Sequence, residues 1–310
     1  MTQRDRWCLL LYLTLAVATS FADLRMRAYP ARVVESYIPG IVGGTEEAPG
    51  LYRVLAPYLV YDAAKITGAS LQSVWYATRL LWFVAAYLAI HVYLRVWFDA
   101  GPAFAGVALT AATLPLLFTN SWAHPDHIPE LALFTAGAWA IARQRDLLFA
   151  VLLAFASLNR ETAVFLVVLY LVAAPWSRSH LLRSALFGGE WFLIYAGLRL
   201  ARGFHSYDFW QLGRNLEFLK LLPSTYDPYY RAYAYFGVIA FGPMVYLAAR
   251  AAAPLFVRRA LLVVPVFVAV AMTFSSIVES RIFTPLYALL LPGVMFALFA
   301  PIPRSGDLPC

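Results

Sequence analysis

The run VWYATRLLWFVAAYLAIHVYLRVW, residues 74–97, decides the fold, because it is the longest apolar stretch of the 310-residue chain. A helix needs about 20 apolar residues to cross the ~30 Å hydrocarbon core of a bilayer, and this run exceeds that length. Further apolar runs lie at 7–22, 103–119, 128–142, 147–158, 163–175, 184–200, 233–249, 260–276 and 282–300. The pattern predicts an all-α, polytopic transmembrane helical bundle of about ten membrane segments (8–10), with residues 1–310 forming a single membrane domain.

The composition is typical of a membrane protein. Hydrophobic residues make up 62% and charged residues 13% of the sequence, and the mean hydropathy is +0.68. A soluble domain has roughly 25% charged residues. The net charge of +7 comes from basic residues in short loops, where they orient a membrane protein, so we exclude nucleic acid as a partner. Cys8 and Cys310 predict neither a disulfide framework nor a metal site.

The placement of arginines predicts the orientation of the bundle. Every second loop carries arginines, at residues 4 and 6, 95, 143 and 145, 178 and 183, 250, 258 and 259, and 304. The positive-inside rule places these loops and both termini in the cytoplasm. The other loops then face the exterior, and the longest are 23–73 and 201–232. Two stretches within them, 51–66 and 212–222, are too short to span and predict interfacial helices. In the second, the leucines at 212, 216, 219 and 222 share one helical face.

Other assignments follow from local patterns. Runs 147–158 and 163–175 are compatible with two short spans or with one hairpin that enters from the cytoplasm. The first run also resembles a signal peptide, although we favour an uncleaved span. Within run 74–97, we expect Arg79 to snorkel outward and His91 to be packed inside the bundle.

Ionisable residues gather in the short loops that are predicted to be exterior. His124, Asp126, His127 and Glu130 place two imidazoles and two carboxylates within seven residues, between two apolar runs. Such a group is suited to proton transfer, and a divalent metal is compatible with it, although the spacing matches no specific metal signature. A polar turn, in which proline ends one helix and starts the next, explains the same residues without chemistry.

Two further pairs combine arginine with glutamate. Arg160 and Glu161 lie between apolar runs, where charges need partners or a water-filled cavity. The alternative is a helix start with Asn159 as its N-cap. Glu279 and Arg281 precede the last run and form either an interfacial ion pair or a phosphate grip.

The arginines are also the expected partners of the acidic loops. We expect acidic side chains of 23–35 and 124–130 to approach Arg53, Arg160 or Arg281, because no short loop can satisfy its own charges.

The layout resembles the GT-C class of membrane glycosyltransferases, in which a first span leads into a large, acidic exterior loop with interfacial helices. Residues 279–283, Glu-Ser-Arg-Ile-Phe, followed by Pro285, give the closest local match. They are similar to the His-Lys-Glu-x-Arg-Phe motif of eukaryotic mannosyltransferases of this class. Ile277 and Val278 replace the His and Lys, and an extra residue precedes the Phe. Residues 49–57 and 159–162 also resemble elements of bacterial proteins of GT-C type.

The resemblance implies transfer of a sugar from a polyprenyl-phosphate donor, with a loop carboxylate as general base. An acidic pair directly after the first span, found in several GT-C families, is missing, so Asp23 and Glu35 both remain candidates. The candidate catalytic residues are Asp23, Glu35, Asp126 and Glu161. The candidate substrate- and phosphate-binding residues are Arg53, His124, His127, Arg160, Glu279 and Arg281. The expected partners are the lipid-linked donor and membrane lipids, and the expected location is a bacterial cytoplasmic membrane with the site on its periplasmic face.

Three other functions are compatible with the sequence. A polymerase or ligase of lipid-linked glycans is a close variant. A secondary transporter would use the intramembrane charges as ion or substrate sites, but such proteins usually show internal repeats, and none is visible. A non-catalytic membrane scaffold would leave the clustered charges of the short loops unexplained.

Overall fold

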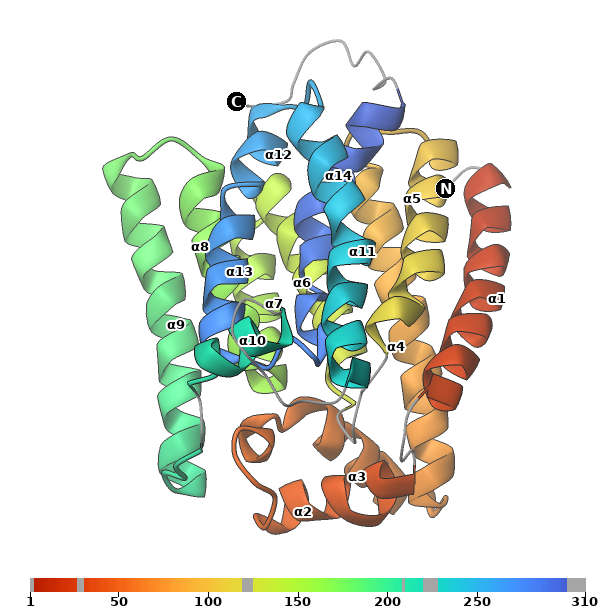
Figure 1. The fold of residues 1–310 in the computed structure, drawn as a ribbon, viewed down its shortest axis with the longest axis vertical. Coiled ribbons are helices and arrows are strands. Elements are labelled where there is room, and N and C mark those ends of the chain that lie inside the picture. The colour runs from red at the N-terminus through yellow and green to blue at the C-terminus, as the bar shows by residue number, and fades with distance from the viewer. Residues whose placement is uncertain (1–2, 27–30, 119–124, 208–209, 220–227, 300–310) are drawn as a thin grey trace.

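The computed structural model describes residues 3–26, 31–118, 125–207, 210–219 and 228–299. In these ranges the chain is built of helices and has no strand, so the predicted all-α fold is confirmed (Figure 1). Eleven of the described helices, which differ in length, form a bundle along the long axis of the molecule. They are α1 (Gln3–Met26), α4 (Leu71–Leu94), α5 (Ala100–Thr113), α6 (His127–Ala142), α7 (Asp146–Asn159), α8 (Val164–Ala173), α9 (Arg178–Arg202), α11 (Pro228–Arg250), α12 (Leu255–Ala260), α13 (Val263–Phe274) and α14 (Leu286–Leu298).

Three stretches of the described residues are long and apolar enough to cross a membrane: 71–94, 100–117 and 255–274. Shorter apolar helices accompany them. Large apolar side chains are exposed on the outer faces of the bundle, including Leu81 (67%) and Leu193 (71%). Exposed apolar surface of this kind is typical of contact with lipid. The prediction of about ten segments is not confirmed by these three stretches and stays a prediction, as does the orientation.

Small residues let neighbouring helices approach closely. A Cβ atom added at Gly293 of α14 would lie 2.8 Å from the Cβ atom of Ala248 in α11, and one added at Gly137 of α6 would lie 2.9 Å from Leu166 of α8. Membrane helices commonly pack through such small side chains, because lipid provides little hydrophobic drive for helix association.

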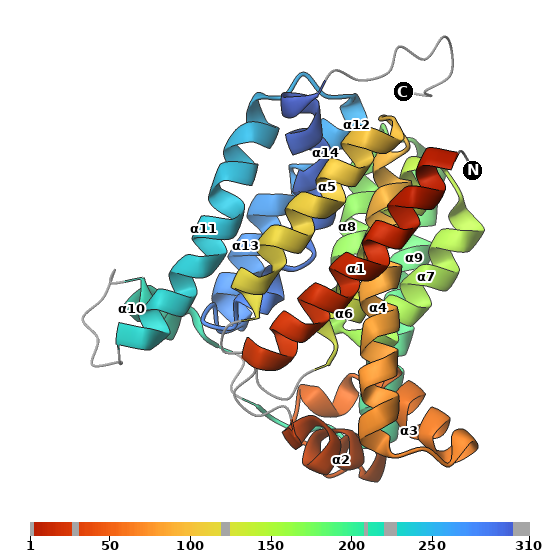
Figure 2. The same ribbon diagram turned by 90° about the vertical axis from the view of Figure 1, so that its right-hand side faces the viewer.

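Buried polar contacts hold α1 against α4, beside which it runs (Figure 2). The hydroxyl of Tyr12 lies 2.6 Å from Nδ1 of His91, and the hydroxyl of Tyr87 donates to Thr19 at 2.8 Å. His91 is therefore packed, as the sequence predicts. Arg79 does not snorkel outward, because it is 5% exposed and lies 3.5 Å from the carboxylate of Asp23.

Short helices form a layer across one end of the bundle, which we call the cap layer (residues 33–67; Figure 1). It contains the π-helix η1 (Val33–Tyr37), α2 (Ile38–Gly43), the 3₁₀ helix η2 (Gly50–Tyr52) and α3 (Leu55–Thr67). The helix predicted near 51–66 is thus present as α3. Arg202 of α9 ties the layer to the bundle by donating to the carbonyl of Ile41 and the hydroxyl of Tyr58, and Tyr52 donates to the carbonyl of Gly203 at 2.9 Å.

The second predicted interfacial helix is α10 (Leu212–Phe218), but its leucine stripe is not its buried face. The buried side chains are Asn215 and Phe218 instead. Asn215 donates to the carbonyls of Met272 and Ser275, both at 2.7 Å, and accepts from the backbone of Ile277 at 3.1 Å. An amide that satisfies three backbone groups at the end of α13 fixes the position of α10 more specifically than an apolar stripe would.

The doubtful runs 147–158 and 163–175 form two helices, α7 and α8, joined by Arg160 and the 3₁₀ helix η4 (Glu161–Ala163). The free ends of this helical hairpin meet, because Tyr170 near the end of α8 donates to Asp146 at the start of α7 at 3.1 Å. The chain therefore returns to the end of the bundle from which it came.

Candidate functional site

Charged side chains from four parts of the chain meet at the end of the bundle beneath the cap layer. Three parts are short connections of the bundle with the adjoining helix ends, residues 125–130, 159–163 and 279–284, and the fourth is the cap layer. Each connection adjoins an apolar helix, so its charges turn to one another rather than to solvent. We call the group the charged cluster: Arg53, Asp126, Glu130, Arg160, Glu161, Glu279 and Arg281.

Arg53 connects the cap layer to two carboxylates. Its Nη1 donates to Asp126 at 3.1 Å, and its Nη2 and Nε donate to the two oxygens of Glu161 at 2.6 and 3.4 Å. A forked guanidinium matches a carboxylate in this bidentate way. Burial alone would lower the pKa of Arg53, but the charges of Glu161 and Asp126 raise it well above the ordinary value, so the side chain stays charged.

The backbone leaves the helical conformation at Arg160, which is extended (φ −163°, ψ 144°) between α7 and η4. This turn directs a buried guanidinium to Glu130, where Nη1 donates at 2.7 Å, and Nε lies 3.6 Å from Asp126. Asn159 is the last residue of α7 and donates to the carbonyl of Asp126 at 2.9 Å. The interpretation of Asn159 as an N-cap is therefore wrong, because its amide joins two connections of the charged cluster.

Arg281 is a buried arginine beside Glu279. It is 1% exposed and its Nη2 donates to Glu279 at 2.5 Å, while Nε and Nη1 are buried without a hydrogen-bond partner among the described residues. Thr284, on the same connection, lies 3.4 Å from Glu130. Burial alone would raise the pKa of Glu279, but Arg281, with Arg53 and Arg160 farther off, lowers it. Buried donors without partners are costly, so an anion would gain from binding them.

A cavity of about 670 Å³ adjoins the charged cluster, within the size range of small-molecule sites. Arg160 and Glu161 line its polar side, and Trp191 of α9 donates to the carbonyl of Glu161 at 3.2 Å. Val270 and Phe274 of α13 line its apolar side, and 37% and 45% of their surfaces are exposed.

Arg199 of α9 also lines this cavity, and sequence reasoning missed it. Its guanidinium carbon lies 4.3 Å from the ring centroid of Tyr52 and 3.5 Å from that of Tyr195, and the residue is 8% exposed. Stacking between aromatic rings holds the guanidinium in place, and its Nη1 also donates to the carbonyl of Tyr195 at 3.3 Å. An available signal was an arginine at the end of an apolar run with a tyrosine one helical turn before it.

Asp23 and His127 lie in a second buried group on α1, α4 and α6. The carboxylate of Asp23 is fully buried, 3.5 Å from Arg79 and 3.8 Å from Nε2 of His127. The expectation that acidic loops approach the three arginines thus holds for Asp126 and Glu130, whereas the arginine beside Asp23 is Arg79. Neither Asp23 nor His127 lines the cavity beside the charged cluster.

Two other candidates fall outside the charged cluster. Glu35 lies on η1 with an exposed side chain and is not part of the charged cluster. His124 lies outside the described residues. Among the residues that the structure does describe, no three His, Cys, Asp or Glu side chains are grouped as a metal site would require. The carboxylates of Asp126, Glu130 and Glu161 are paired with arginines instead.

Comparisons with protein families, with curated proteins and with solved structures give no match for this chain.

Proposed function

We propose that the chain is a membrane glycosyltransferase that moves a sugar from a polyprenyl-phosphate donor to an acceptor at the exterior face. In this proposal the bundle contributes about ten membrane segments with both termini in the cytoplasm, and the charged cluster faces the exterior or periplasmic side.

The cavity beside the charged cluster carries the proposal, because it joins two kinds of wall. Arg160, Glu161 and Arg199 offer cations and a carboxylate, while Val270 and Phe274 form an exposed apolar wall of the same cavity. A lipid-linked sugar phosphate has this division, with a polar head and an apolar chain.

The residues have suitable chemistry for the transfer. Glu161 lines the cavity with a side chain that is 30% exposed, so its carboxylate can accept the proton of an acceptor hydroxyl. The acceptor oxygen then bonds to the anomeric carbon, the bond from that carbon to the phosphate oxygen breaks, and polyprenyl phosphate leaves with the electron pair. Arg160 lines the same cavity, and Arg281, in the adjoining charged cluster, has two N–H groups without a partner among the described residues. Arg160 is suited to contact the leaving phosphate, and the charge of Arg281 behind it adds to the stabilisation of the growing negative charge.

The test measures release of polyprenyl phosphate by the purified protein in nanodiscs, supplied with a panel of polyprenyl-phosphate sugars. Glu161→Gln and Arg160→Lys should each lower the rate by roughly tenfold or more, the scale of one lost transition-state contact. The lysine fails because an ammonium cannot bind phosphate with two parallel hydrogen bonds. Arg281→Lys should act in the same direction, and Glu279→Gln less strongly.

Matched controls make the same types of substitution at residues that do not line the cavity. Glu47 is exposed in the cap layer and Arg258 is exposed on α12, so Glu47→Gln and Arg258→Lys should retain the wild-type rate. Wild-type rates in Glu161→Gln and Arg160→Lys, with a donor that the wild type turns over, would overturn the proposed roles. Absence of release from every donor in the panel would overturn the substrate class.

A further inference from the structure

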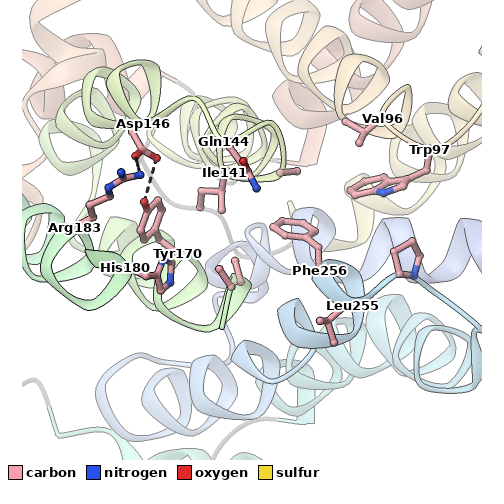
Figure 3. A pocket seen from close by; sticks show the side chains of 14 residues that line it. Val96, Trp97, Ile141, Gln144, Asp146, Tyr170, His180, Arg183, Leu255 and Phe256 are labelled. Carbon is pink, nitrogen blue, oxygen red and sulfur yellow. Dashed lines mark hydrogen bonds and ion pairs between the residues drawn. The ribbon is translucent and has the colours of Figure 1, made fainter. Parts of the chain in front are cut away.

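A second cavity, of about 450 Å³ (Figure 3), is lined by helix ends that lie opposite the cap layer (Figure 1). It lies where α4, α6 and α8 end and where α7, α9 and α12 begin. It shares no lining residue with the cavity beside the charged cluster, so it is a separate site. The proposed glycosyl transfer does not use it.

One wall of this second cavity is polar and carries an arginine with N–H donors available for a ligand. Arg183 donates to Asp146 at 2.7 Å through Nη1, and Tyr170 donates to the other oxygen of Asp146 at 3.1 Å. His180 stacks on Tyr170 with ring centroids 5.0 Å apart (Figure 3). The side chain of Arg183 is 58% exposed, and a guanidinium has five N–H donors, so the bond to Asp146 leaves donors for a ligand.

The other wall is aromatic and apolar. Trp97 is 5% exposed and stacks on Phe256 with ring centroids 5.9 Å apart, and Leu255 lies beside them with 41% of its surface exposed. An inorganic anion would contact little of this wall. An acyl chain or glycerol backbone would cover it, and tryptophan is the residue that prefers the level of membrane headgroups.

The charge at this end of the bundle favours an anion. The arginines near the helix ends are Arg95, Arg143, Arg145, Arg178, Arg183, Arg250, Arg258 and Arg259, whereas the acidic residues near them are Asp99 and Asp146. Basic pockets between membrane helices commonly bind anionic lipid headgroups. We propose that the cavity lined by Arg183, His180 and Trp97 binds the phosphate-bearing headgroup of an anionic phospholipid, with the start of its apolar chains against Trp97 and Phe256.

The test compares the whole protein in nanodiscs of phosphatidylcholine alone and of phosphatidylcholine mixed with phosphatidylglycerol. Retained phosphatidylglycerol is counted by native mass spectrometry, and its affinity is measured by titration in detergent. Arg183→Gln should weaken this affinity roughly fivefold, the scale of one arginine near an anionic headgroup. Asp146→Asn should strengthen it, because the variant removes the negative charge beside Arg183. If this ion pair had only a structural role, Arg183→Gln and Asp146→Asn would not change the affinity for phosphatidylglycerol in opposite directions.

The control is Arg258→Gln, which removes an exposed arginine from the same end without touching the cavity. It should leave the affinity for phosphatidylglycerol close to that of the wild type. An equal loss in Arg258→Gln and Arg183→Gln would overturn the site in favour of diffuse surface charge. Displacement of the lipid by millimolar inorganic phosphate would show that the site binds free phosphate and not a lipid headgroup. Failure of the wild type to retain phosphatidylglycerol over phosphatidylcholine would overturn the proposal altogether.

Discussion

Asp126 is a buried carboxylate of the charged cluster, and its charge is balanced by two nearby arginines. It is 1% exposed, Arg53 lies 3.1 Å from its carboxylate and Arg160 lies 3.6 Å away. Taking such groups out of water costs several kcal/mol each, and only close partners offset that cost. The pairing of Arg53 with two carboxylates therefore contributes to the docking of the cap layer as well as to the site.

Arg53→Gln should destabilise the protein by about 3 to 5 kcal/mol, because it leaves Asp126 buried without its nearest cation. The thermal unfolding midpoint, followed by tryptophan fluorescence in detergent, measures the effect. The double variant Arg53→Gln with Asp126→Asn should lose less than the sum of the two single variants, since it removes the uncompensated charge as well. Additive losses would show that Arg53 and Asp126 are not coupled.

At the scale of elements, the contact of α11 with α14 depends on a glycine. A Cβ atom at Gly293 would lie 2.8 Å from Cβ and 3.1 Å from Cα of Ala248, so one of the two backbones has to move. Gly189 of α9 is the matched control, because a Cβ atom there meets nothing within 4 Å. Both glycines are inside helices, so alanine brings the same gain in helix propensity, about 1 kcal/mol, at either position.

Overpacking in Gly293→Ala should lower the free energy of unfolding by about 1 to 3 kcal/mol. The gain in helix propensity offsets part of this loss. Gly189→Ala should be neutral or stabilising. The unfolding midpoints of the two variants, measured under the same conditions, check this difference. A loss in Gly189→Ala as large as that in Gly293→Ala would mean that loss of glycine, and not the approach of α11, is responsible.

The same scale shows what sequence could and could not predict. Apolar runs predicted helices because their length and composition are local properties, and α3 and the two helices α7 and α8 followed from them. Adjacent Arg and Glu residues indicated the charged cluster, because charges in apolar surroundings need partners. The partner of Asp23 could not be predicted, since Arg79 lies on another helix and only the packing of α1 against α4 brings them together. Arg199 was missed for the same reason: Tyr52, which holds it, belongs to the cap layer.

At the scale of the whole molecule, the two cavities lie at opposite ends of one bundle, so each proposal constrains the orientation of the other. Residues 146, 180 and 255 line the cavity with Trp97, at the end opposite the cap layer. The anionic-lipid site needs that end to carry the positive charge of a cytoplasmic face. The transferase proposal needs the charged cluster to face the exterior. A single orientation, with both termini in the cytoplasm, satisfies both conditions.

Reporter fusions after residues 145, 180 and 255 should therefore be cytoplasmic, and fusions after residues 45, 124 and 215 should be exterior, as the arginine pattern predicts. The described structure makes this test sharper than the sequence alone, because 145, 180 and 255 are near one cavity while 45 lies in the cap layer. Disagreement within the first group would contradict the fold. Agreement within both groups with the sides reversed would leave the fold intact but would place the charged cluster in the cytoplasm. Sugar transfer at the exterior face would then be excluded. The arginines at the opposite end of the bundle would face the exterior, contrary to the positive-inside rule.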